Sequence, residues 1–277
     1  MKRRLQLSRL GGELLLLLAT LIMLVPIYYF LIGAFKPRLD IVKFPLVITP
    51  DMMTTGNFTY AINKMKIGAS LANTGIITLA SLAILVVAAS LAGFAIARVK
   101  HRFFKFYYTA MIALMVIPFI GALIPIVVLI RRLNMIGNLW ANILIQAAWN
   151  MPFAVFLYTG FMRALPNELE EAAYIDGCSM FRVYFNIFLP LLTPVTATCL
   201  IRCGIGIWND YLVSASLLNS VRQPTLMVAV YSFFGQYVSE YGYAFAGIIM
   251  ASLPVVVMFL FLQKYFIKGI TAGAVKG

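Results

Sequence analysis

The acidic residues of this chain gather in one short segment. Of its nine Asp and Glu residues, four lie between residues 164 and 190: Glu168, Glu170, Glu171 and Asp176. Carboxylates can serve as general acids, as metal ligands or as docking charges, and the residues that accompany them decide between these uses. The chain has one histidine and three cysteines, too few and too scattered for a metal site or a nucleophilic triad. The cluster therefore favours an ionic contact with a partner over catalysis, and we expect no enzyme activity.

The pattern around these acids predicts two short helices. Pro166 and Asn167 are typical of a helix start, and the acids that follow stabilise a first turn. Gly177 suits a helix end or a sharp turn. Apolar residues then recur at helical spacing up to Pro190, which is expected to open the next apolar run: Met180, Phe181, Tyr184 and Phe188. An ordinary solvated connector is the alternative, but an amphipathic helix rich in acids favours a protein partner.

This segment interrupts a sequence that is too apolar for a soluble protein. Of 277 residues, 62% are hydrophobic and 11% are charged, and the mean hydropathy is +0.94, whereas soluble domains carry about 25% charged residues. Six apolar runs have the length of a membrane-spanning helix; they cover residues 14–35, 71–96, 106–130, 141–163, 191–213 and 242–263. We therefore predict an all-α polytopic membrane protein with six transmembrane helices, organised as one domain over residues 1–277.

The basic residues predict the orientation of these helices. The net charge of +13 comes from Lys and Arg at the ends of apolar runs, which indicates a membrane surface and lipid rather than nucleic acid. An inside N-terminus places the clusters at 2–9 and 98–105 in the cytoplasm, while much of the opposing charge lies in the long loop 36–70, which has less weight. Both termini and segment 164–190 are therefore expected in the cytoplasm, with residues 14–35 as an uncleaved first span.

Segment 164–190 also resembles a known signature. Glu171-Ala172-Ala173, Gly177, Ile187 and Leu189-Pro190 match, at the right spacing, the EAA motif of binding-protein-dependent ABC importer permeases. The resemblance implies the type I permease fold and a coupling loop over 164–190 that sits in a cleft of a separate ATPase. In it, Glu171 would pair with a basic group and Gly177 would allow the bend. The residues implied in ATPase coupling are Glu168, Glu171, Ala172, Ala173, Asp176, Gly177, Ile187, Leu189 and Pro190.

Two further segments resemble the carbohydrate branch of that family, in particular its maltose-type second permease. They are Trp208-Asn209-Asp210-Tyr211 and the tail 268–277. The resemblance implies a sugar or oligosaccharide as cargo, a bacterial-type inner membrane, a homologous permease, two copies of the ATPase and an extracytoplasmic sugar-binding protein. It also implies a tail that contacts the ATPase through Thr271, Gly273, Lys276 and Gly277. No G-x-x-x-x-G-K-[ST] occurs here, so ATP and Mg²⁺ are expected on the ATPase, with no cofactor or metal on this chain.

Ionisable residues inside a span are candidates for the transport path. Arg202 is expected near the middle of span five and Asp210 toward its outer end, about 12 Å apart and unpaired. The path residues that we predict are Asn150, Arg202, Trp208, Asn209, Asp210 and Tyr211. Arg202 could instead stabilise a subunit interface, and the 208–211 aromatics could form an interfacial belt. By resemblance, the outer loop 214–241 contacts the binding protein, with Asn219, Arg222, Gln223, Gln236 and Tyr237 as candidates.

Two other functions stay open at this point. An ion-driven transporter or channel would use Arg202 and Asp210 as charge relays, but it leaves the acidic segment unexplained. An ABC permease for a non-sugar solute would keep the architecture and change only the cargo.

Overall fold

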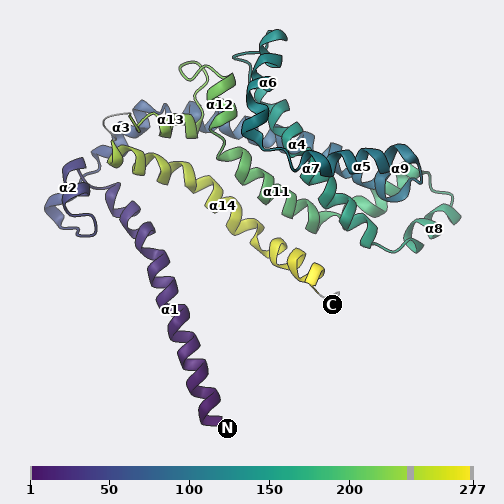
Figure 1. Ribbon diagram of the computed structural model, residues 1–277, viewed down its shortest axis with the longest axis horizontal. Helices are drawn as coiled ribbons and strands as arrows, with labels where there is room; N and C mark the ends of the chain where they lie inside the picture. Colours follow the sequence, from purple (N-terminus) through teal and green to yellow (C-terminus); the bar gives the residue numbers. More distant parts are fainter. Residues whose placement is uncertain (1, 236–239, 275–277) are drawn as a thin grey trace. The chain divides into compact units, whose positions relative to one another are not determined.

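The computed structural model describes the backbone of residues 2–235 and 240–274, with the side chains of 11–235, 240–261 and 263. Within this range the chain forms helices and no β-strand (Figure 1). A helix satisfies every backbone group within its own segment, which an apolar run in lipid requires because no water is present. The predicted all-α class is confirmed.

The helices follow one another with short connections. They are α1 (Lys2–Gly33), α2 (Arg38–Lys43), η1 (Pro50–Met52), α3 (Gly56–Lys64), α4 (Ile67–Arg98), α5 (Arg102–Leu114), α6 (Phe119–Arg132), α7 (Leu139–Ala164), α8 (Glu168–Ile175), α9 (Met180–Arg182), η2 (Val183–Phe188), α10 (Leu189–Leu191), α11 (Thr193–Trp208), α12 (Leu212–Leu217), α13 (Leu226–Tyr231) and α14 (Tyr241–Ala274). The described residues within 1–67 and 229–252 form one compact unit, and those within 68–228 and 253–277 form another.

The first unit is organised around the buried amide of Asn57. Its Nδ2 donates to the carbonyl oxygens of Ala34 at 2.9 Å and of Lys36 at 2.8 Å. Gly242 of α14 lies so close that a Cβ there would sit 2.7 Å from this amide. The Lys36 ammonium donates to the carbonyl of Phe44 at 2.9 Å, and burial lowers the pKa of Lys36 because the charged form loses its water.

The second unit contains the main core, built by α4, α7, η2 and α11. In it α7 lies beside both α5 and α11 (Figure 1). Gly93 lets α4 approach α7 closely, since a Cβ there would lie 2.8 Å from the Cβ of Tyr158. The Tyr158 hydroxyl donates to Thr196 Oγ1 at 2.9 Å and so joins α7 to α11. Fully buried core side chains include Leu85, Ala89, Val155, Tyr158, Met162, Phe188, Cys199 and Cys203.

Four described helices are long and apolar enough to span a membrane. They cover Gly11–Gly33, Ile67–Arg98, Leu139–Ala164 and Tyr241–Phe261, and two bent pairs raise the number to six if each pair is one span. The other two predicted spans, 106–130 and 191–213, were expected to be continuous helices. Each corresponds instead to a pair of helices with a bend between them.

Proline chemistry accounts for both bends. The pair α5 and α6 is bent by 109° just before Pro118, which disfavours helical backbone in the residue that precedes it. The pair Met180–Leu191 and α11 is bent by 69° at Leu192. Pro194 has no N–H to offer the carbonyl of Pro190, and the Thr193 hydroxyl donates to that oxygen instead, at 2.8 Å.

Candidate functional site

Residues 164–190 fold as the predicted helix–turn–helix. Helix α8 begins at Glu168 with three acids in its first turn. It ends in a Schellman motif: Cys178 N–H donates to Ala173 O at 2.9 Å and Gly177 N–H donates to Tyr174 O at 3.0 Å. Gly177 has φ +76°, a left-handed conformation that favours glycine. The bend predicted at Gly177 is therefore present in the fold.

The second half of the segment is a helix with a π-helical turn. It runs from Met180 to Leu191, with η2 in the π conformation, an irregularity that occurs often at functional sites. One face is buried with Ala173 of α8 in the main core; its residues are Val183, Tyr184 and Phe188. The segment is thus packed into the core of the second unit. We call α8 through α10 (residues 168–191) the coupling module, after the ATPase coupling that the sequence predicts for it.

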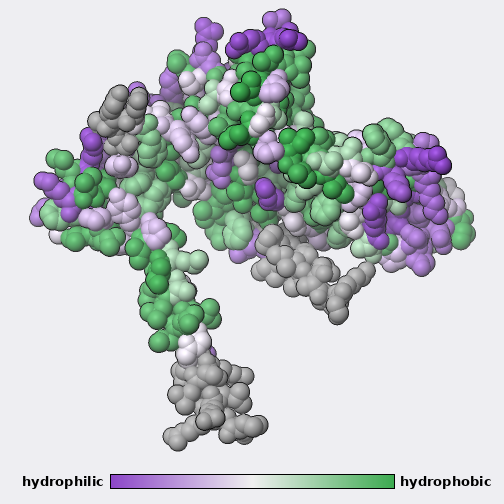
Figure 2. Space-filling model, in the orientation of Figure 1, coloured by the Kyte–Doolittle hydropathy of each residue, from purple (hydrophilic) through white to green (hydrophobic). Residues whose placement is uncertain are grey.

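The opposite surface of the coupling module combines acids with apolar side chains. Ile175 is 86% exposed and Phe181 is 75% exposed. Exposed residues of the predicted set are Glu168, Glu171, Ala172, Asp176, Gly177, Leu189 and Pro190, while Ile187 is half-buried and Ala173 is buried. Hydrophilic side chains gather at this end of the unit, around α8 (Figure 2). Such a surface can bind a protein groove that offers cations and an apolar floor.

Arg98, at the end of α4, holds this module in place. Its Nη2 donates to the carbonyl oxygens of Met162 and Leu165, both at 2.9 Å, and its Nη1 donates to Asn167 Oδ1. Its Nε lies 3.5 Å from Glu170 Oε2. From the sequence, Arg98 is interpreted only as one of the basic residues that predict the cytoplasmic side of the membrane. No local pattern identifies its partners, because they lie more than sixty residues further along the chain.

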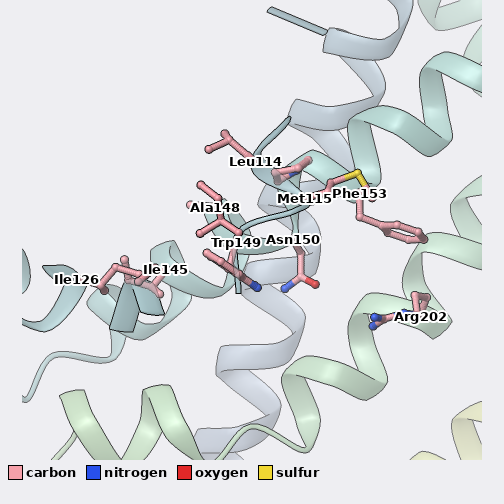
Figure 3. A pocket seen from close by; sticks show the side chains of 12 residues that line it. Leu114, Met115, Ile126, Ile145, Ala148, Trp149, Asn150, Phe153 and Arg202 are labelled. Carbon is pink, nitrogen blue, oxygen red and sulfur yellow. The ribbon is translucent and has the colours of Figure 1, made fainter. Parts of the chain in front are cut away.

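A second candidate site is a pocket of about 500 Å³ in the second unit, beside the α5–α6 bend. Asn150 and Trp149 reach it from α7, Met115 from the bend and Arg202 from α11 (Figure 3). The Arg202 guanidinium lies 5.7 Å from the centre of the Phe153 ring. Among the described residues, no carboxylate lies within 4.0 Å of it. The pocket thus offers a cation, an amide and aromatic faces.

The other predicted path residues lie elsewhere. Helix α11 ends at Trp208, so residues 209–211 form a turn before α12 and not the outer part of the span as expected. The physical reason is that Asp210 caps α12: its carboxylate accepts from the N–H of Val213 at 3.1 Å and of Ser214 at 2.9 Å, and from the Ser214 hydroxyl at 2.8 Å. An Asp ahead of an apolar run is the sequence signal for this cap. Trp208, Asn209, Asp210 and Tyr211 do not line the pocket.

The predicted outer loop 214–241 is partly helical, because it contains the end of α12 and all of α13. Asn219 Oδ1 accepts from the N–H groups of Val221 and Arg222 at 3.0 and 3.2 Å and so closes a turn. Arg222 is exposed and Gln223 is half-buried. Thr271 and Gly273 belong to the last turns of α14. Gln236, Tyr237, Lys276 and Gly277 lie outside the described residues.

Metal-ligand sets are absent from the described part of the chain, which contains no group of three or more neighbouring His, Cys, Asp or Glu side chains.

The arrangement of helices matches a solved membrane transporter. A chain in the crystal structure of a bacterial ABC transporter involved in the import of the acidic polysaccharide alginate superposes with a TM-score of 0.81 at 19% identity, over 94% of this chain and 97% of that one. At that identity the likeness shows the fold alone, which is the type I permease fold. The protein is a multi-pass helical membrane protein.

Sequence comparison then shows the family. Residues 85–272 match the model of the binding-protein-dependent transport system inner membrane component, and the chain belongs to that family of ABC importer permeases, as predicted. It is 39% identical to the melibiose/raffinose/stachyose import permease protein MelC of Bacillus subtilis, over 91% of both chains. It is 34% identical to the probable starch degradation products transport system permease protein AmyC of Thermoanaerobacterium thermosulfurigenes, over 93% of both chains. These relatives are transport permeases and not enzymes.

Proposed function

We propose that this chain imports a sugar or oligosaccharide as one of two homologous permease subunits of an ABC importer. An extracytoplasmic binding protein delivers the sugar, and two copies of a separate ATPase, which bind ATP and Mg²⁺, drive the cycle. Both termini and the coupling module face the cytoplasm. The names of the relatives support the cargo, and the family supports the assembly.

The observation that carries this proposal is the exposed surface of the coupling module. Acids and apolar side chains stand out from a segment whose other face is locked into the core. The ATPase binds this surface, and Glu171 forms an ion pair with a basic group of the ATPase. Closure of the two ATPases then moves the module as a rigid body. The motion opens the path toward the outside while sugar is released by the binding protein.

The pocket beside the α5–α6 bend is part of the sugar path in this proposal. Asn150 and Arg202 supply hydrogen bonds to hydroxyl groups, and Trp149 offers an aromatic face to the apolar side of a ring. The outer residues Asn219, Arg222 and Gln223 contact the binding protein, and the end of α14 contacts the ATPase. The alternative of an ion-driven transporter requires Asp210 as a charge relay. It is less well supported, because the Asp210 carboxylate accepts hydrogen bonds from the first turn of α12 as a helix cap.

Substitution of Gly177 by Trp tests the role of the coupling module. The matched control is Gly137→Trp, because Gly137 has φ +78° and, like Gly177, has no atom within 4 Å of a built Cβ. Both variants carry the same backbone strain, about 1–2 kcal/mol. We expect Gly177→Trp to abolish sugar uptake by cells with normal amounts of the protein in the membrane, and Gly137→Trp to retain it. Normal uptake by Gly177→Trp, or equal loss in both, would contradict the assignment.

A further inference from the structure

Arg98 is nearly removed from solvent, and its guanidinium binds three separate elements. Its side chain is 6% exposed. The acceptors described above belong to the end of α7 and to the connection before α8, and Glu170 of α8 forms an ion pair with the same guanidinium. The centre of the Phe188 ring in η2 lies 4.9 Å from Cζ, a cation–π distance.

The chemistry of arginine suits this position. A guanidinium carries five N–H donors in one rigid plane, so its hydrogen bonds fix several acceptors relative to one another. The last carbonyl groups of a helix have no partner within the helix and carry partial negative charge. At the end of α7 the Met162 carbonyl accepts from Arg98 as well as from the Leu165 N–H, and Arg98 also donates to the carbonyl of Leu165, just beyond the helix. The same guanidinium reaches the first turn of α8. It thereby joins α4, α7 and the coupling module at one point.

The same face of α4 continues this contact toward the core. Ser90, Phe94 and Arg98 are four residues apart and therefore share one face of the helix. Ser90 Oγ lies 2.8 Å from the Tyr184 hydroxyl, and the Phe94 ring lies 5.3 Å from the rings of Tyr184 and Phe188. By contrast, the covalent route from the module to α11 passes the 69° bend at Leu192.

From this geometry we infer that Arg98 is a positioning residue for energy coupling: it fixes the coupling module to α4 and α7, so that movement of the module reaches these helices directly as well as through α11. The inference rests on the proposed function of the module. It assigns Arg98 no contact with sugar or nucleotide.

The test measures sugar uptake and ATP hydrolysis together, in the complete transporter reconstituted in vesicles. The probe is whichever of melibiose, raffinose and stachyose the wild-type transporter imports. For Arg98→Met we expect the number of sugars imported per ATP hydrolysed to fall about tenfold, a usual size for the coupling between two sites. Arg98→Lys keeps the charge but not the planar set of donors, and we expect an intermediate ratio. Arg102→Met, at an exposed arginine four residues further on, should keep the wild-type ratio.

A purely structural role predicts a different result. Uptake and hydrolysis would then fall together with the amount of assembled transporter, and an unchanged ratio in Arg98→Met would overturn the inference. If Arg98→Met does not assemble, Arg98→Lys and Glu170→Gln decide by the same ratio: a lowered ratio in either supports the inference, and wild-type ratios in both overturn it.

The same assay separates this inference from the proposed function. If Gly177→Trp loses uptake while the Arg98 variants keep their ratio, the module couples without Arg98, and only the inference fails. If Gly177→Trp also imports sugar normally, the assignment of the module itself fails, and the inference fails with it.

Discussion

Two arginines of the second unit, Arg98 and Arg202, have opposite environments. The Arg98 guanidinium donates to backbone carbonyls and a side-chain amide and lies beside a carboxylate. Arg202 has an aromatic ring as its described neighbour and faces a pocket of about 500 Å³. An arginine whose Nη1 and Nη2 donate to its own chain, and whose Nε faces a carboxylate of that chain, can hold parts together and is not open to a ligand. An arginine that faces an open pocket can still offer donors to a passing molecule.

The difference shows that the surroundings of a charged residue in a membrane protein distinguish a structural role from a role in binding. A charge in or near a span is expensive and requires a reason, but two reasons are possible. A charged side chain whose partners all belong to its own chain is suited to hold helices together. A charged side chain that faces a pocket is suited to bind the transported molecule. The predictions below test each side of this comparison.

The largest effect is expected where α4 approaches α7, because this contact brings Arg98 to its acceptors. At Gly93 a Cβ would lie 2.8 Å from the Cβ of Tyr158 and 3.1 Å from the backbone of Thr159, so Gly93→Leu must separate the helices. Overpacking of this kind costs about 1–3 kcal/mol or more. We expect a strongly lowered midpoint of thermal unfolding in detergent and little assembled transporter.

The matched control for Gly93 is Gly75, in the same helix but with no atom within 4 Å of a built Cβ. There Gly75→Ala should stabilise the helix by about 0.5–1 kcal/mol, while Gly93→Ala should destabilise the protein. Equal midpoints for the two alanine variants would show that the close approach of α4 and α7 has no energetic consequence.

A smaller effect is expected at Arg202. If Arg202 donates to the sugar as proposed, loss of that hydrogen bond lowers uptake about tenfold. The factor in Arg202→Met should then differ among the sugars that the wild-type transporter imports, because each places different hydroxyl groups in the pocket. The loss in Arg98→Met should be the same factor for every sugar. Uptake assays with each sugar that the wild-type transporter imports make the comparison. A loss in Arg202→Met that is identical for each sugar would instead place Arg202 at a structural interface.

The two arginines also mark what could be predicted from sequence. The coupling module was predictable because its signals are local: Pro166 and Asn167 start a helix, and Gly177 ends it. The partners of Arg98 were not, since a bond between Arg98 and Met162 joins residues 64 positions apart. The sequence therefore predicts a cytoplasmic position for Arg98 but does not identify its neighbours.

The continuity of the spans was predicted less well for a physical reason. Hydropathy is an average over a window, so it shows that 106–130 is apolar but not that the helix stops before Pro118. The same averaging extended span five beyond Trp208, although Asp210 already carried the chemistry of a helix start. Local capping rules would have corrected the hydropathy boundary there.

The smallest effect is expected at Asp210. This residue tests whether a third charge has a structural role, as proposed for Arg98, or a role in the transport path, as proposed for Arg202. Since its carboxylate accepts from Val213, and from both the N–H and the hydroxyl of Ser214, Asp210→Ala should destabilise the protein by about 0.5–2 kcal/mol. Asp210→Asn should lose less than Asp210→Ala, because Asn keeps one of the two acceptor oxygens and is itself a good helix cap. The midpoint of thermal unfolding measures both.

Sugar uptake by Asp210→Asn then decides between a cap and a relay. A cap needs an oxygen acceptor and no charge, so uptake should remain close to that of the wild type. A charge relay needs a group that binds and releases a proton or an ion, and an amide does neither, so uptake would be lost even though the fold is retained. Loss of uptake at an unchanged unfolding midpoint would therefore show that the charge of Asp210 is needed for transport. Asp210 would then belong with Arg202 as a residue of the transport path, and its main role would not be to cap α12.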